Sequence, residues 1–131
     1  MLETLDRHEC LRLMATASVG RVGVSVRALP AILPVNFALI GTNIVIRTVP
    51  GTKLDAAMDR TVVAFEVDSY AQDGAWGWSV LVQGVCSEIA DPEGILGPDA
   101  ERLRAWAFDD GVAERFIRIE VSFVNGRRFH R

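Results

Sequence analysis

The sequence lacks several features that would place the protein in a specialised class. No apolar run approaches the roughly 18 to 20 residues that a membrane-spanning helix needs, and the first ten residues show no basic region followed by an apolar one. Lysine and arginine together number 14 against 17 acidic residues, without the basic excess that is typical of nucleic-acid-binding surfaces. These absences predict a cytoplasmic protein whose partners include neither a membrane nor nucleic acid.

Cysteine and histidine are also scarce. The two cysteines, Cys10 and Cys86, are too few for a disulfide framework, and we expect both to be reduced and buried. Neither His8 nor His130 stands at a metal-ligand spacing from a second histidine or a carboxylate cluster. The sequence also contains no G-x-S-x-G nucleophile elbow and no nucleotide P-loop. It therefore predicts no metal site and gives no support to nucleophilic catalysis or ATP binding.

What the chain has instead is apolar residues in short alternating segments. Half of its 131 residues are apolar, which fits one domain over residues 1–131 with a sizeable core. Val22, Val24 and Val26 alternate with polar or small residues, as in a half-buried strand. The predicted strands are a segment from residue 19, a hairpin over residues 31–48 turning at 41–43, residues 61–69, residues 78–90, residues 115–124, and a short terminal strand after an Asn-Gly turn at 125–126.

Short helices separate some of these strands. We expect a first helix capped by Asp6, a short helix within residues 51–60, and a later helix capped by Asp99, with Leu103, Trp106 and Ala107 on its apolar face. Gly84 interrupts a long strand and predicts a bulge or a close backbone approach. Many strands joined by short turns favour a mainly β fold, an antiparallel barrel with short flanking helices.

The segment RTVPGTKL collects anion-binding groups at the end of a predicted strand. Arg47 and Lys53 supply positive charge, Thr48 and Thr52 supply hydroxyl donors, and the free amides at the start of the following helix favour the same anion. The motif predicts a phosphate site. The alternative is that the two basic residues are solvated surface charges.

Two further strand segments carry residues suited to a planar ligand. Asn36 interrupts the apolar run LPVNF, where its amide could bond the polar edge of a ring or could face solvent. Trp76 and Trp78 stand two apart before Ser79, so the indoles share a face and could stack on a ring system. Their alternative role is ordinary packing in a core or an interface.

The carboxylates Glu66 and Asp68 share one face of a predicted strand. If they were buried, their like charges would raise the pKa of one of them. We expect them instead to be exposed to solvent.

Taken in order, several segments resemble the pyridoxamine 5′-phosphate oxidase-like family, the flavin-binding split barrels. The resemblance is carried by PVNF, RT-x-x-GTK and GWSVLV-x-G in combination, within VGRVGVSV, LPVNFALIG, VVAFEVDSY and the terminal RIEVSFVNGRRF. It implies a six-stranded antiparallel split barrel with flanking helices, and a homodimer that holds FMN between its subunits.

The resemblance also assigns roles to residues. It implies that Arg47, Thr48, Thr52 and Lys53 hold the FMN phosphate. It places Val35 and Asn36 against the isoalloxazine ring, and it has Trp78 and Ser79 complete the site, with the second subunit as their possible source.

Family members differ in their reactions, so the implied function is an FMN-dependent oxidoreductase that acts on an unidentified small molecule. One alternative is a reductase that uses a deazaflavin coenzyme, whose anionic tail would seek the same cations. Another is a flavin-binding module without turnover, and a further one is a structural dimer with an empty groove. Because a flavin supplies its own redox chemistry, none of these requires a general acid or base from the chain.

Overall fold

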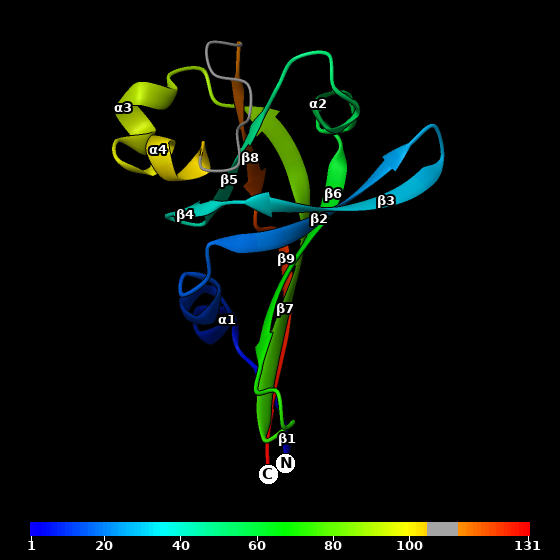
Figure 1. Cartoon of the computed structure of the whole chain (residues 1–131), viewed down its shortest axis with the longest axis vertical. Helices are drawn as coiled ribbons and strands as arrows, with labels where there is room; N and C mark the ends of the chain where they lie inside the picture. Colours follow the sequence, from blue (N-terminus) through cyan, green and yellow to red (C-terminus); the bar gives the residue numbers. More distant parts are fainter. Residues whose placement is uncertain (105–112) are drawn as a thin grey trace.

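The computed structural model describes residues 1–104 and 113–131, which form an antiparallel sheet that curls around a main core (Figure 1). Neighbouring strands follow the order β3-β2-β6-β7-β8-β5-β4, while β9 pairs with β1 and β7. In chain order the elements of these residues are β1 (Leu2–Leu5), α1 (Arg7–Met14), β2 (Val19–Val26), β3 (Leu29–Asn36), β4 (Ala38–Ile40), β5 (Asn43–Thr48), α2 (Lys53–Ala57), β6 (Val62–Tyr70), β7 (Trp76–Glu88), α3 (Pro92–Leu96), α4 (Asp99–Leu103), β8 (Arg115–Glu120) and β9 (Phe123–His130).

The predicted fold class is confirmed: the protein is mainly β, with the curled antiparallel sheet of a split barrel and short flanking helices. The described residues form nine strands, where the sequence pattern predicted six or seven and the family resemblance six. One addition is β1, which pairs with β9 in the register Leu2 to Phe129 through Leu5 to Gly126. The fold class is unchanged, because the added strands are short or divide a segment already expected to be extended.

The helix α1 forms as its sequence predicts. The Asp6 carboxylate accepts a hydrogen bond from the Glu9 amide at 2.8 Å, which confirms Asp6 as the N-cap. One side of the helix buries Cys10, Leu13 and Met14 in the main core. Both cysteines are buried and free, as expected.

The predicted hairpin over residues 31–48 is wrong in its first arm, which the structure divides at Phe37. All eight residues of β3 pair with β2, and only Ala38–Ile40 pair with β5. Pro30 and Pro34 have no N–H, and β3 can hold them because it lies at the edge of the sheet. Phe37 is buried against Phe65, with ring centroids 5.0 Å apart, and this contact fixes the break.

The C-terminal prediction also needs correction. The strand expected over residues 115–124 ends at Glu120, and Asn125-Gly126 lies inside β9 rather than in a turn. A β-carbon at position 126 would overlap the Cys10 Sγ atom, so this glycine allows α1 to approach the sheet. The glycine reflects close packing rather than chain reversal.

The last helices differ from expectation as well. Asp99 is the first residue of α4, and Pro98 occupies the cap without a side-chain hydrogen bond. The preceding α3 had no predicted counterpart. Trp106 and Ala107, expected on the helix face, lie outside the described residues. A second apolar cluster packs beneath these helices, formed by Ala38, Val45, Ile89, Leu96, Leu103 and Phe116.

The long strand β7 joins the two parts of the sheet. It pairs with β6 along most of its length, with β9 from Trp76 to Gln83, and with β8 from Cys86 to Glu88. Gly84 lies where the partner changes, and a β-carbon there would overlap the Glu120 carbonyl oxygen. The predicted close backbone approach at Gly84 is confirmed.

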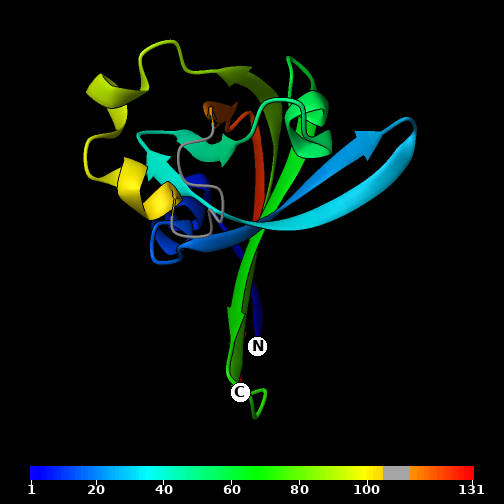
Figure 2. The ribbon, with the colours of Figure 1, turned by 45° about the horizontal axis from the view of Figure 1, so that its top comes forward.

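Two parts of the sheet project from the body. In Figures 1 and 2 the hairpin of β2 and β3 extends to one side, near α2, while β1 and the ends of β6, β7 and β9 project downward. We call the second projection the arm and define it as residues 1–5, 68–79 and 126–131. Within the described ranges, none of the helices is long and apolar enough to cross a membrane.

Candidate functional site

The first candidate site is a groove of about 780 Å³ between α2 and the hairpin of β2 and β3. Figure 2 shows α2 above this hairpin. Ala31 and Leu33 contribute apolar side chains from β3, while Thr52 and Lys53 lie at the start of α2. The groove has the size of a small-molecule site, and it combines an apolar wall with a cationic end.

The start of α2 is fixed by Thr52. Its hydroxyl donates to the Val49 carbonyl at 2.8 Å and accepts from the Asp55 amide at 3.1 Å, which makes Thr52 the N-cap. Gly51, with φ of 88°, makes the turn that precedes the cap. Lys53 follows as the first helical residue; it is exposed, and it is the only lysine in the sequence.

A buried polar network holds α2 against the sheet. Thr48 and Asp55 are both buried, and the Thr48 hydroxyl donates to Asp55 Oδ1 at 2.7 Å. Arg115 of β8 donates to the same oxygen at 2.8 Å. Sequence reasoning missed Asp55 and Arg115. The spacing T-x-x-D, from Thr52 to Asp55, is a capping signal that could have identified the aspartate, whereas the distant Arg115 gave none.

The structure separates Arg47 from the other predicted phosphate ligands. Adjacent strand residues point to opposite faces, so Arg47 and Thr48 lie on different sides of β5. The Arg47 Nε atom donates to Glu114 at 2.8 Å, and only 11% of the arginine side chain is exposed. Glu114 also accepts from Arg104, and this hydrogen bond, with the weaker influence of Arg47, lowers the pKa of the Glu114 carboxyl.

Val35 and Asn36 occupy opposite faces of β3. Val35 is buried on the same face as Ala31 and Leu33, so it continues the apolar wall of the groove toward the core. Asn36 points the other way, and its Nδ2 atom is buried without a hydrogen-bond acceptor among the described residues. A buried amide of this kind is uncommon in a folded chain and fits a position where a ligand supplies the acceptor.

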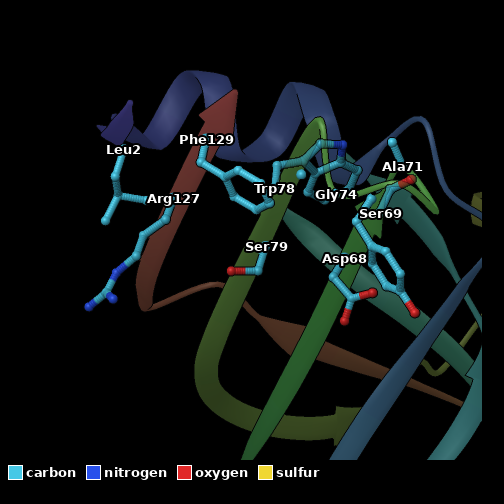
Figure 3. A pocket seen from close by; sticks show the side chains of 11 residues that line it. Leu2, Asp68, Ser69, Ala71, Gly74, Trp78, Ser79, Arg127 and Phe129 are labelled. Atoms are coloured by element: carbon cyan, nitrogen blue, oxygen red, sulfur yellow. The ribbon is translucent and has the colours of Figure 1, made fainter. Parts of the chain in front are cut away.

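Trp78 and Ser79 lie in a different pocket, which we call the arm pocket (Figure 3). It has a volume of about 440 Å³ and is formed by β6, β7, β9 and β1. Trp78 is half-buried against the main core, and Ser79 is exposed. Within one chain, then, the groove holds Thr52 and Lys53, and the arm pocket holds Trp78 and Ser79.

The acidic pair on β6 is half-buried rather than exposed as expected. Arg21 on the neighbouring strand donates to Glu66 at 3.4 Å and to Asp68 at 3.2 Å. Burial, followed by the hydrogen bond and the negative charge of Asp68, raises the pKa of Glu66 to about 7. The Glu66 carboxyl therefore holds a proton more tightly than an ordinary glutamate.

Across residues 1–104 and 113–131, no cluster of three or more histidine, cysteine or acidic side chains could hold a metal ion.

A family model described as pyridoxamine 5′-phosphate oxidase matches residues 6–128. The uncharacterized protein Rv0080 of Mycobacterium tuberculosis is 38% identical over 129 residues, which cover 95% of this chain and 83% of that protein. These matches extend over nearly the whole chain.

Solved structures agree with this relationship. A putative pyridoxamine 5′-phosphate oxidase from Corynebacterium glutamicum is 28% identical, with a TM-score of 0.78 and full coverage of both chains. An FAD binding protein from Mycobacterium smegmatis is 27% identical, with a TM-score of 0.76, and the alignment covers 99% of this chain and 100% of the other.

Proposed function

The chain belongs to the pyridoxamine 5′-phosphate oxidase family, and we propose that it is a flavin-binding oxidoreductase that holds FMN in the groove beside α2 and acts on a small molecule. The observation that carries the proposal is the groove itself, which joins an apolar wall from β3 to the cationic side chain of Lys53. A flavin has the matching parts, an apolar ring system and an anionic phosphate. The flavin binding stated for the Mycobacterium smegmatis protein, with 27% identity, supports the same cofactor class.

In this proposal Lys53 and Thr52 hold the phosphate. The lysine ammonium is exposed in the groove, and the Thr52 hydroxyl can exchange its bond to the Val49 carbonyl for one to the anion. Thr48 supports them indirectly, because it holds Asp55 and thereby the first turn of α2. Arg47 remains in the proposed set as a second cation, although the described contacts commit it to Glu114.

Val35 would contact the ring from the groove side of β3. Asn36 remains in the proposed set because its buried amide lacks an acceptor among the described residues, although it points to the face of β3 away from the groove. We propose that Trp78 and Ser79 reach the cofactor from the arm of a second subunit, since one chain keeps them in a separate pocket. The protein would then be a homodimer. When bound, the flavin supplies electron transfer, and the residues of this chain bind and orient it.

The first experiment is a titration of FMN with purified protein, followed by flavin absorbance and fluorescence. We expect saturable binding that weakens about tenfold or more in Lys53→Ala, because a charge-assisted contact to phosphate is lost. Arg118→Ala is the matched control, since Arg118 is also an exposed cation but its side chain bonds Ser87 away from the groove. Equal FMN affinity in wild type and Lys53→Ala would refute the assigned phosphate site.

The single lysine allows a second readout. Acetylation of amines can be followed by mass spectrometry at Lys53, and a bound phosphate should protect that side chain from reagent. We expect saturating FMN to slow modification of Lys53. Equal rates with and without FMN would contradict contact between Lys53 and the cofactor.

Parallel titrations separate the alternative cofactors. FAD is one of them, because the Mycobacterium smegmatis relative is named as an FAD binding protein, and the deazaflavin coenzyme is another. Tighter binding of either one than of FMN would transfer the proposal to that cofactor. Reduction of the bound cofactor by a nicotinamide donor would support turnover, whereas binding without reduction or acceptor transfer would favour a non-catalytic module.

A further inference from the structure

The arm pocket is built from two cross-strand rows on one face of the sheet. In the first row Tyr70 of β6 pairs with Gly77 of β7, which pairs with Phe129 of β9. In the second row Asp68, Ser79 and Arg127 occupy the corresponding positions on the same three strands. Residues two apart along a strand share a face, so the aromatic row and the polar row lie side by side. Figure 3 labels all three members of the second row, and Phe129 of the first.

The aromatic row forms an apolar floor. Gly77 has no side chain, and the Phe129 ring lies where a β-carbon at position 77 would be, with its nearest atom 2.7 Å from that point. Tyr70 is 69% exposed and Phe129 is 38% exposed, so each ring keeps surface that a ligand could cover. An aromatic ring is the natural occupant of such a surface, because stacking or edge contacts add to the burial of apolar area.

The polar row places opposite charges at the two ends of the pocket. Neighbouring strands lie about 4.8 Å apart, so Asp68 and Arg127 are separated by roughly 10 Å of sheet, with Ser79 between them. Asp68 already accepts from Arg21 at 3.2 Å. Arg127 is exposed and makes no ion pair within residues 1–104 and 113–131. The unpaired guanidinium is therefore available to an anionic group.

We propose that the arm pocket binds an aromatic monocarboxylate, with its ring against Phe129 and Tyr70 and its carboxylate on Arg127. A single guanidinium can form two parallel hydrogen bonds to one carboxylate, a bidentate contact. The negative charge of Asp68 disfavours a ligand that carries two negative charges. Asp68 instead favours a ligand with a hydrogen-bond donor at its far end. Amino-substituted aromatic carboxylates have all three features.

This inference deepens the proposed function and rests on it in one respect. Trp78 and Ser79 line the arm pocket and also belong to the set proposed to face the flavin. A molecule held here would be placed beside the cofactor, so we take the aromatic monocarboxylate to be the substrate class. Binding of the ring and the carboxylate to the pocket, by contrast, does not require a flavin.

The test uses 6-amino-2-naphthoate, a fluorescent aromatic monocarboxylate, and its uncharged amide as probes. Each is titrated with the full chain, with and without saturating FMN. We expect the carboxylate to bind about tenfold more tightly than the amide, and Arg127→Gln to remove that difference. Phe129→Leu should weaken both probes alike. Arg118→Gln, which makes the same charge change outside the pocket, should retain wild-type behaviour.

The outcomes separate the inference from the proposed function. Probe binding that depends on Arg127 and persists with FMN bound supports the arm pocket as a separate site beside the cofactor. Binding of FMN but not of the probe overturns the inference and leaves the flavin proposal standing. Displacement of the probe by FMN also overturns it, because the pocket would then hold the flavin itself. Probe binding without any flavin binding supports the pocket while the proposed function fails.

Discussion

Asp55 is a charged side chain in the interior whose partners are both on other elements. It is 7% exposed, and one of its oxygens accepts from Thr48 and from Arg115. Removing Asp55 leaves the buried Thr48 hydroxyl without its acceptor and leaves Arg115 with only the more exposed Glu88 and Asp59, which costs more than the set contributes as a whole. Its role is therefore best seen by truncation.

We expect Asp55→Ala to lower the free energy of unfolding by about 3 kcal/mol, because Arg115 and Thr48 lose their acceptor. Urea denaturation measures the change. Asp59→Ala is the control. Asp59 is 65% exposed and its carboxylate comes no nearer than 4.0 Å to the Arg115 guanidinium, so its loss should change stability by less than about 0.5 kcal/mol. Equal effects of the two substitutions would show that the buried network contributes little.

Glu66 makes stability depend on pH. Its pKa is raised to about 7 in the folded chain from the ordinary 4.5, first by burial and then by Asp68. Between these values the folded state binds more protons than the unfolded state, so the free energy of unfolding falls as pH rises. The stabilising contribution is complete below about pH 4.5 and lost above about pH 7.

Urea denaturation of wild type and Glu66→Gln across pH 4 to 8 isolates this contribution. The stability of wild type relative to the variant should decline through the window from about 4.5 to about 7 and then remain level. Asp68→Asn should move the end of the decline to lower pH, because it removes a negative charge next to Glu66. A difference that is independent of pH would contradict the raised pKa.

At the scale of elements, β7 depends on a residue without a side chain. Gly84 lies where β7 leaves β9 for β8, against the Glu120 carbonyl. Backbone cannot move aside as a flexible side chain can, so we expect Gly84→Ala to cost about 3 kcal/mol or to prevent folding. In Gly23→Ala the added carbon would meet the Ala64 β-carbon at 3.4 Å, and the loss should stay below about 1 kcal/mol.

Thermal unfolding compares these two glycine variants. A similar melting temperature for both would show that β7 and β8 can separate without loss of the sheet. Soluble expression of Gly23→Ala serves as the check that a strand glycine can be replaced in this chain.

Local patterns predicted the elements whose stabilising contacts are nearby. The predicted α1 cap depends on Asp6 and an amide three residues later. The α2 cap, from Thr52 to the Asp55 amide, has the same spacing, although the sequence motif predicted Thr52 as a phosphate ligand instead. The division of the predicted hairpin at Phe37 depends instead on Phe65. The strand β1 forms because it pairs with β9 at the other end of the sequence, a partner that no local pattern reveals.

The same distinction applies to the candidate site. The sequence identified Thr52 and Lys53 together, and the structure places both in one groove. It could not show that Arg47 faces Glu114, because alternation along β5 gives opposite faces but not the partner on each face. The family resemblance implies a homodimer in which Trp78 and Ser79 could come from the second subunit. The structure contains one chain, so this contribution from a second subunit stays a proposal.

At the scale of the whole molecule, the sheet exposes an apolar outer face. Ile32, at the β3 edge, and Phe123 are 75% and 73% exposed, and they end one cross-strand row. Gly23, Ala64 and the polar Gln83 lie between them in that row, and the two small residues leave the surface shallow. A self-complementary contact with a second copy would cover such a face.

We expect light scattering to give twice the 14.4 kDa mass of one chain, and Ile32→Glu to shift the protein toward the monomer. Ile32 is mostly exposed in the single chain, so this change should leave its fold intact. Ile95→Glu on α3 is the control, because Ile95 is 52% exposed on a different element. A wild-type mass of one chain would count against the dimer.

The strand β7 is paired on both sides, with β6 on one and with β9 and then β8 on the other. This position affects the rates of hydrogen exchange and of folding. Its central amides point alternately to the strands on its two sides, and each can exchange with solvent only when the strand on its own side separates. Because β7 is paired on both sides, hydrogen exchange there should report global unfolding, while the arm tip opens locally. Its partnership with β8 and β9 also waits until those later strands have been synthesised. The sheet should therefore close late, on the slow timescale of folds dominated by distant strand pairs.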